Sequence, residues 1–143
     1  MTYLSFSGEE TKGIAAALAK ELRGGEFICL IGDLGAGKTT FTQGLAAALG
    51  SKVRAKSPTF TVVNEYPVVD HPTIRLIVHC DFYRLTKSSE LRAIELDEYR
   101  RPDTVIIVEW PNILPDVEWK PDIMVTIEHQ GDDRRKVTVE GVV

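Results

Sequence analysis

The sequence predicts an α/β fold of the P-loop NTPase type, with a mixed sheet, a parallel centre, antiparallel edge strands and flanking helices. An unbroken apolar run at 26–32, EFICLIG, leads directly into a glycine-rich loop and then a helical pattern. A second apolar run at 104–110, TVIIVEW, has the composition of a strand covered on both faces, as in a parallel sheet. Two alternating segments at 123–129 and 135–141 flank a turn and predict an antiparallel hairpin.

Length and charge limit the possible functions. With 143 residues, 43% of them hydrophobic, the chain is long enough for one domain, 1–143, and too short for a separate substrate domain. The formal net charge is −4, so no general basic field draws the protein onto a nucleic acid. We therefore expect any nucleic acid to be reached through a partner.

The cysteines and the apolar runs favour a cytoplasmic protein. Cys29 and Cys80 each lie in an apolar run without metal-binding or disulfide spacing, so we expect two buried, reduced thiols. No apolar run approaches the roughly 20 residues of a membrane span. The N-terminal MTYLSFSGEE lacks the basic and apolar regions of a signal peptide.

The N-terminal segment predicts a short strand at 3–6 followed by a helix. Ser7 and Glu10 have the spacing of a capping box, in which Ser7 caps the helix and Glu10 reaches back. We expect the glycine pair at 24–25 to end this helix. Its predicted apolar face consists of Ile14, Ala17, Leu18 and Leu22.

The middle of the chain predicts an antiparallel hairpin. Its strands are expected at 60–69 and 74–80, with the four residues DHPT as the connection. The segment 88–100 then predicts one helix, capped by Ser88 or Ser89.

The glycine-rich loop matches the full P-loop pattern, Gly32-x-x-x-x-Gly37-Lys38-Thr39. Its glycines allow backbone N–H groups to turn inward around phosphate oxygens, and the helix expected at 38–49 adds the positive end of its dipole. Lys38 would reach the β- and γ-phosphates, and the Thr39 hydroxyl would bind Mg²⁺. This pattern predicts a nucleotide-binding enzyme.

Two carboxylates directly follow apolar strands. Asp81 ends IRLIVHCD, and Glu109 ends TVIIVE. A P-loop NTPase needs an acidic residue at such a position to hold Mg²⁺ and its waters. One of the two could bind the metal while the other orients water or senses the γ-phosphate.

Other polar and aromatic residues have less specific patterns. Thr59, in KSPTFT, is a candidate switch residue facing the γ-phosphate, although a polar turn explains it almost as well. His79 could be a base, but a packed side chain is favoured. A solvated helix face is favoured over a metal cluster for ELDE at 95–98. Packing is favoured over base stacking for Trp110.

The nucleotide class follows from missing motifs. The sequence contains no Asn-Lys-x-Asp, so adenine is favoured over guanine. A small-molecule P-loop kinase remains an alternative, with Asp81 and Arg84 available, but 143 residues leave little chain for both a lid and an acceptor site.

Four segments together resemble the bacterial TsaE family, the ATPase component of the machinery that makes threonylcarbamoyladenosine in tRNA. The resemblance runs from Glu9 to the terminal hairpin. Its motifs, in family order, are GDLGAGKTTF at 32–41, SPTFTVVNEY at 57–66, HCDFYRL at 79–85 and VEWPN at 108–112.

The resemblance implies a set of site residues. Thr39 and Glu109 would hold Mg²⁺, and Asp81 would matter for hydrolysis. Thr11 and one arginine of the last hairpin, Arg134 or Arg135, match family positions near the adenine. The phosphates of ATP would be bound by Gly32, Asp33, Leu34, Gly35, Ala36, Gly37, Lys38, Thr39 and Thr40.

The resemblance also implies how the protein works. Family members are expected to be weak ATPases alone, to bind the TsaD–TsaB heterodimer and to support repeated turnover of tRNA modification by hydrolysing ATP. A partner would then handle the tRNA, which agrees with the acidic composition.

Overall fold

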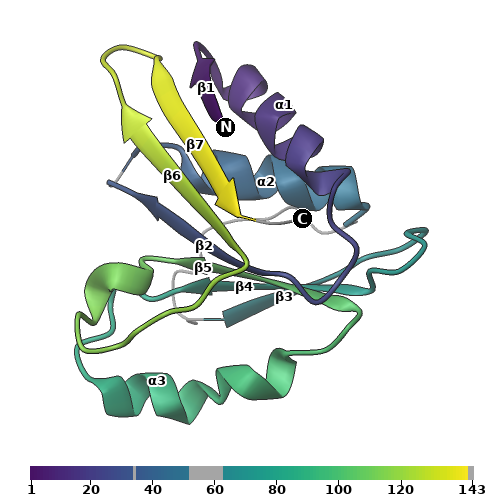
Figure 1. The fold of residues 1–143 in the computed structure, drawn as a ribbon, viewed down its shortest axis with the longest axis vertical. Coiled ribbons are helices and arrows are strands. Elements are labelled where there is room, and N and C mark those ends of the chain that lie inside the picture. Colours follow the sequence, from purple (N-terminus) through teal and green to yellow (C-terminus); the bar gives the residue numbers. More distant parts are fainter. Residues whose placement is uncertain (34, 52–62, 142–143) are drawn as a thin grey trace.

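The computed structural model describes residues 1–33, 35–51 and 63–141, and its centre is a seven-stranded sheet (Figure 1). The strand order is β1-β7-β6-β2-β5-β4-β3. The strands are β1 (Thr2–Ser5), β2 (Phe27–Gly32), β3 (Val63–Pro67), β4 (Leu76–Asp81), β5 (Thr104–Glu109), β6 (Ile123–His129) and β7 (Arg135–Gly141).

The pairing confirms the predicted fold class. Strand β2 runs parallel to both β5 and β6, and β4 runs parallel to β5. The outer pairs β1–β7, β6–β7 and β3–β4 are antiparallel. The sheet therefore has a parallel centre and antiparallel edges, and both predicted hairpins are present.

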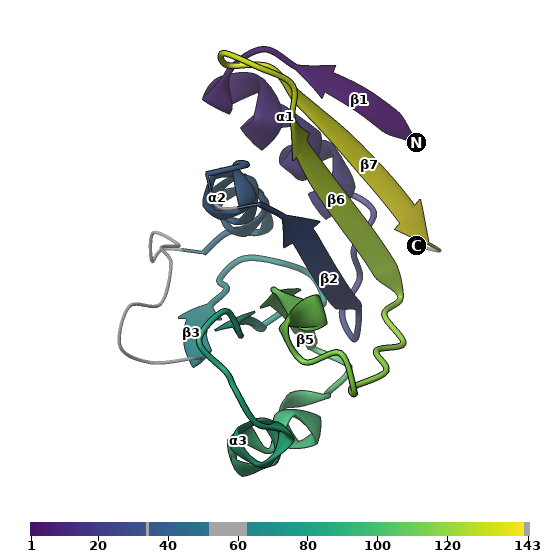
Figure 2. The same cartoon turned by 90° about the vertical axis from the view of Figure 1, so that its left-hand side faces the viewer.

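Helices cover both faces of the sheet (Figure 2). The helices α1 (Gly8–Ala19) and α2 (Lys38–Leu49) lie on one face, and α3 (Ser88–Ile94) lies on the other. Two short 3₁₀ helices follow, η1 (Leu96–Tyr99) and η2 (Pro111–Ile113). Within the described part of the chain, none of the helices has the length and apolar character needed to cross a bilayer.

The core consists of two apolar clusters, one on each face. In β2, Ile28 and Leu30 pack toward α1 and α2, whereas Phe27 and Cys29 pack toward α3. Cys80 belongs to the same cluster as Cys29, and both are free thiols. Burial raises the pKa of each thiol to about 12, which keeps them protonated and unreactive, as expected from the sequence.

Helix α1 begins as predicted but ends earlier. The Ser7 hydroxyl accepts from the Glu10 N–H at 3.1 Å, while the Glu10 carboxylate accepts from the N–H of Phe6. The helix ends at Ala19, so the prediction that the glycine pair at 24–25 ends it was wrong.

The predicted buried face of α1 was also partly wrong. Ala17 is exposed, and Thr11, Ala15, Leu18 and Ala19 are buried. The reason is the close approach of α2, because a Cβ at Gly44 would lie 2.7 Å from the Cα of Lys12. Contact of two backbones turns the small residues inward.

The predicted helix at 88–100 and the predicted connection at 70–73 both needed correction. The segment 88–100 forms two helices, because Glu95 has a left-handed φ of 54° that ends α3 and begins η1. Lys87, rather than a serine, occupies the N-cap position. The connection between β3 and β4 spans residues 68–75 instead of 70–73, and Val68 forms a bridge with Ser51 before the chain turns. Residues 60–62 of the predicted first strand lie outside the described residues.

Candidate functional site

Three parallel strands end at the same edge of the sheet and place their last residues together. Gly32 ends β2, Asp81 ends β4 and Glu109 ends β5, with Asp81 in register with Glu109. Helix α2 begins at this edge, at Lys38. The residues around a cavity of about 320 Å³ here are Gly35, Gly37, Lys38, Thr39, Thr40, Asp81, Glu109, Trp110 and Arg135. Crevices at the carboxyl ends of strands are the usual ligand sites of α/β sheets.

The loop before α2 needs its glycines. Gly35 and Gly37 have φ values of 77° and 108°, which side chains with a Cβ rarely adopt. A Cβ on Gly32 would lie 2.7 Å from the carbonyl oxygen of Ile127. The N-cap residue of α2 is Gly37, which has no side chain to occupy the first turn, and this turn lies at the cavity edge. This geometry suits an anion such as a phosphate.

The Lys38 side chain is held inside the loop by backbone carbonyls of that loop. It is only 6% exposed, and its ammonium donates to the carbonyls of Gly32 and Asp33, the latter at 3.0 Å. The same nitrogen lies 4.2 Å from the ring centroid of Trp110. Burial lowers the pKa of Lys38 from its ordinary value, while the charges of Glu109, Asp81 and Asp33 oppose this shift.

Asp81 and Glu109 place two carboxylates beside that ammonium. Burial raises the pKa of Asp81, and nearby Glu109 raises it further; the N–H of Tyr83, which donates to Asp81 at 3.0 Å, acts in the opposite direction. Glu109 is 2% exposed. Two crowded carboxylates are stabilised by a cation between or beside them.

These oxygen groups fit Mg²⁺ bound together with a nucleotide. Mg²⁺ takes hard oxygen ligands and usually needs only one or two carboxylates, with waters and phosphates completing the shell. Thr39, with its hydroxyl, and Glu109, with its carboxylate, are both residues of the same cavity wall. Among residues 1–33, 35–51 and 63–141, no cluster of three or more His, Cys, Asp or Glu could hold a metal without such help.

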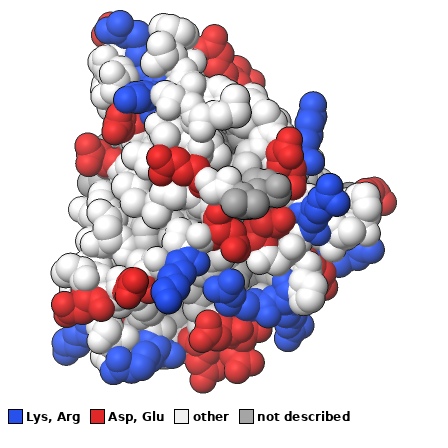
Figure 3. Space-filling model, in the orientation of Figure 1, with Lys and Arg blue, Asp and Glu red and all other residues white. Residues whose placement is uncertain are grey.

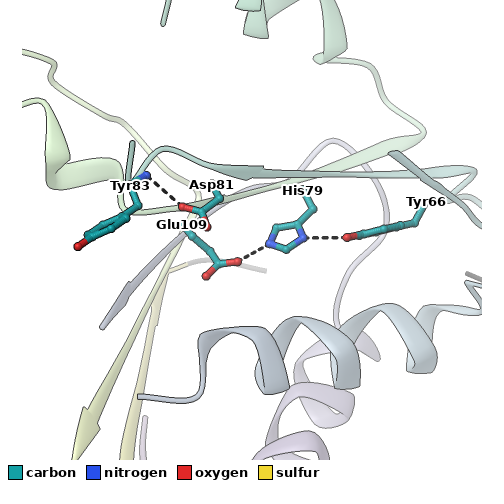
Figure 4. A network of polar contacts seen from close by, with 5 residues as sticks. All are labelled: Tyr66, His79, Asp81, Tyr83 and Glu109. Carbon is teal, nitrogen blue, oxygen red and sulfur yellow. Dashed lines mark hydrogen bonds and ion pairs between the residues drawn. The ribbon is translucent and has the colours of Figure 1, made fainter. Parts of the chain in front are cut away.

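His79 lies behind Glu109 and bonds to it (Figure 4). The imidazole is fully buried, with Nε2 on the Glu109 carboxylate and Nδ1 3.0 Å from the hydroxyl of Tyr66. It does not line the cavity. The side chain is therefore packed, as the sequence favoured, but it is packed against a site residue.

The two hairpin arginines differ in position. Arg135 borders the cavity, and its guanidinium donates to the carbonyls of Ala36 at 2.9 Å and Gly35 at 3.4 Å. Arg134 is exposed and is not part of the cavity wall. The geometry thus favours Arg135 as the arginine that faces a nucleotide.

The remaining predicted residues lie in different places. Thr11 is buried and bonds to the Ser5 hydroxyl at 2.8 Å, so its side chain supports the start of α1 without lining the cavity. The side chain of Asp33 is exposed. Leu34 and Thr59 lie outside the described residues.

Trp110 packs against the apolar cluster on the α3 face, as the sequence favoured, and it also borders the cavity, which the sequence did not predict. Its φ of 57° turns the chain at the end of β5, and its ring lies over Lys38 and 4.8 Å from the ring of Tyr83. A cation over an indole face is attracted by the ring. The sequence signal for this contact with the cavity was the position of Trp110 directly after Glu109, where β5 ends.

Comparison with known proteins gives one consistent family. The model of the family described as "Threonylcarbamoyl adenosine biosynthesis protein TsaE" matches residues 5–137. A Bacillus subtilis protein named tRNA threonylcarbamoyladenosine biosynthesis protein TsaE is 39% identical over 134 residues, covering 94% of this chain and 81% of its own. A protein of the same name from Aquifex aeolicus is 38% identical over 136 residues, which cover 93% of this chain and 90% of that protein.

A solved structure has the same fold. The crystal structure of Bacillus subtilis YdiB has a TM-score of 0.75 and 34% identity, and the likeness covers 100% of this chain and 86% of that one. The resemblance that the sequence motifs indicated is thereby confirmed. This chain belongs to the TsaE family and has that family's role in the biosynthesis of threonylcarbamoyladenosine in tRNA.

Proposed function

We propose that the protein is a P-loop ATPase that supports tRNA threonylcarbamoyladenosine modification by hydrolysing ATP. One observation carries the proposal: Lys38, Asp81 and Glu109 border a single cavity at the start of α2. Phosphoryl transfer depends mainly on positioning and on stabilising charge, and this site concentrates both.

Each residue has a distinct role in this proposal. The N–H groups of the loop and of α2 bind the phosphates, and Lys38 offsets charge on the β- and γ-phosphates. Bound Mg²⁺ would neutralise charge on the phosphate oxygens, held by Thr39 and Glu109. Asp81 would orient the attacking water or couple the γ-phosphate to a partner surface.

Trp110 and Arg135 shape the cavity around those groups. The Trp110 ring shields the Lys38 ammonium from water on one side, at 4.2 Å. Arg135 braces the loop by donating to Ala36 and leaves its charge at the cavity edge. Both contacts reduce the reorganisation needed when a phosphate enters.

We propose adenine as the base and Mg²⁺ as the metal, because the guanine motif is missing and because the two carboxylates suit a hard cation. Competition between ATP and GTP at matched Mg²⁺ concentration tests the base. Tighter binding of ATP is expected, and equal affinity would reject the assignment.

We further propose that the protein acts with TsaD- and TsaB-type partners, which would hold the tRNA. Among the described residues on the face drawn in Figure 3, basic and acidic side chains are interspersed and form no continuous basic surface. The net charge of −4 gives no general attraction to RNA either. Recovery of both partners from a bacterial lysate in an ATP-dependent manner is the expected result, and stimulated hydrolysis in the reconstituted complex is its companion test.

The small-molecule kinase alternative receives less support. A kinase needs an acceptor pocket beside the phosphates. A cavity of about 660 Å³, larger than the one at Lys38, borders Phe27 instead, at the opposite end of β2 from Gly32. Formation of a phosphorylated metabolite by the lone chain would reverse this preference.

A further inference from the structure

A buried chain of three side chains links the middle of the sheet to the cavity (Figure 4). Tyr66 of β3, His79 of β4 and Glu109 of β5 come from three neighbouring strands. They are 2%, 0% and 2% exposed. Each ring nitrogen of His79 has a partner, with Tyr66 on Nδ1 at 3.0 Å and Glu109 on Nε2.

The chemistry of the end group sets the direction of its hydrogen bond with His79. An ionised carboxylate can only accept, so Nε2–H donates to Oε2 of Glu109. The Tyr66 hydroxyl lies 3.0 Å from Nδ1 and bonds to that nitrogen. The tyrosine thereby fixes the orientation of the ring whose other nitrogen bonds to Glu109.

Packing alone does not explain a histidine at this position. Two neighbours on the same face, Ile77 of β4 and Ile107 of β5, are buried aliphatic side chains. An aliphatic residue would fill this place without the cost of removing an imidazole from water. The ring nitrogens of His79 instead find their partners in Tyr66 and Glu109.

The contact constrains the Glu109 carboxylate. Oε2 is engaged by His79, and the other oxygen points away from the imidazole (Figure 4). Glu109 also borders the cavity with Lys38 and Thr39. One oxygen is thus anchored in the protein while the group as a whole faces the place where a metal and phosphates would lie.

We propose that His79, oriented by Tyr66, is a positioning residue that holds Glu109 in the geometry needed to bind a divalent cation with the nucleotide. This inference rests on the proposed function for the cation itself. Partners behind a metal-binding group typically change metal affinity or activity by about 10- to 100-fold when they are removed.

The test compares nucleotide affinity with and without metal in the full-length protein. ADP binding is measured by calorimetry in saturating Mg²⁺ and in chelator, and the ratio of the two affinities gives the metal enhancement. For His79→Leu, we expect unchanged affinity in chelator and a metal enhancement reduced by about 10-fold or more. His79→Gln, whose amide N–H can donate to Oε2, should recover most of the enhancement.

Two further variants separate positioning from packing. Tyr66→Phe removes the hydroxyl that bonds to Nδ1 and orients the ring, so we expect a smaller loss of metal enhancement than in His79→Leu. Ile77→Val disturbs the same buried face without touching Glu109, and it should leave the enhancement unchanged. If His79→Leu fails to fold, the Tyr66→Phe variant decides, and a normal metal enhancement in that variant overturns the proposal.

The outcomes distinguish this inference from the function on which it rests. Absence of any metal enhancement in the unmodified protein would reject the proposed metal site. Normal enhancement in His79→Leu, with enhancement present in the unmodified protein, would overturn the role of His79 alone. Equal loss of affinity with and without metal would also overturn it, because that result indicates a general disturbance of the core.

Discussion

Residues that alternate along β4 and β5 lie on opposite faces of the sheet, and the two faces have different roles. On the α3 face, Val78, Cys80 and Val108 form a dry apolar cluster. On the α2 face, His79 and Glu109 alternate with those residues and are equally buried, yet they are polar and bonded to each other.

This difference shows on which face the fold buries polar groups, whose removal from water costs free energy. Successive side chains of a strand lie on opposite faces of the sheet. Adjacent residues of β4 and β5 therefore serve the apolar core on one face and the cavity on the other. Among the described residues, the buried charged side chains, Lys38 and Glu109, lie on the face covered by α2, where the positive charge of Lys38 offsets the carboxylates.

Lys38→Ala should remove most ATP hydrolysis. No other described lysine borders the cavity, so charge on the β- and γ-phosphates would lose its main protein partner. Removing one preorganised group of this kind costs about 10²–10³ in rate. Steady-state hydrolysis with and without partner proteins measures the effect, and circular dichroism controls for folding. Unchanged turnover would reject the assignment of the loop.

Asp81→Asn and Glu109→Gln should fail in different ways. Because Glu109 is proposed to hold the metal, Glu109→Gln should weaken nucleotide binding in Mg²⁺. Asp81→Asn should bind Mg·ATP nearly as the unmodified protein does but lose hydrolysis. Affinity and hydrolysis are measured for both variants. The reverse pattern would make Asp81 the metal ligand.

The adjacent arginines form a matched pair. Arg135→Ala should lower nucleotide affinity by several-fold, on the order of one charge-assisted hydrogen bond, because its guanidinium braces Ala36 at the cavity. Arg134→Ala removes the same charge from an exposed position and should bind normally. Calorimetric titration of both variants with ADP is sufficient. Equal losses would mean that only net charge matters.

Ile106→Val tests the α3 face of β5. Ile106 is 2% exposed in the apolar cluster, so losing one methylene should cost about 0.5–1.5 kcal/mol of unfolding free energy. Nucleotide affinity should not change, since this side chain faces away from the cavity. Urea denaturation and titration give the two values. A large change in affinity would show that the two faces are not independent.

Asp81→Asn should also show the stability cost of the site. The folded-state pKa of Asp81 is raised above 3.8, so ionisation destabilises the fold progressively as the pH rises from about that value. In the absence of metal and nucleotide, the variant should therefore gain stability relative to the parent at neutral pH. The gain should shrink as the pH falls toward 3.8, as followed by urea midpoints. A gain that is independent of pH would assign it to packing.

Much of the fold and the site was predictable from local pattern. The P-loop spacing, the strand before it and the terminal hairpin were recognised because a strand or a phosphate loop is specified by a few neighbouring residues. The position of Asp81 and Glu109 at strand ends was predictable for the same reason. Helix boundaries were less so, because the left-handed Glu95 that divides α3 from η1 has no strong sequence signal.

The class of fold, the glycine-rich loop and the two carboxylates at strand ends therefore follow from the sequence, because they depend on periodicity and spacing within short segments. The residues that surround this loop depend on tertiary contacts. Gly44 admits the backbone of Lys12 and thereby turns α1, and Arg135 rather than Arg134 faces Ala36. His79 meets Glu109 because β4 and β5 pair in one register and no other, and a contact between residues 30 positions apart has no signature in either segment by itself.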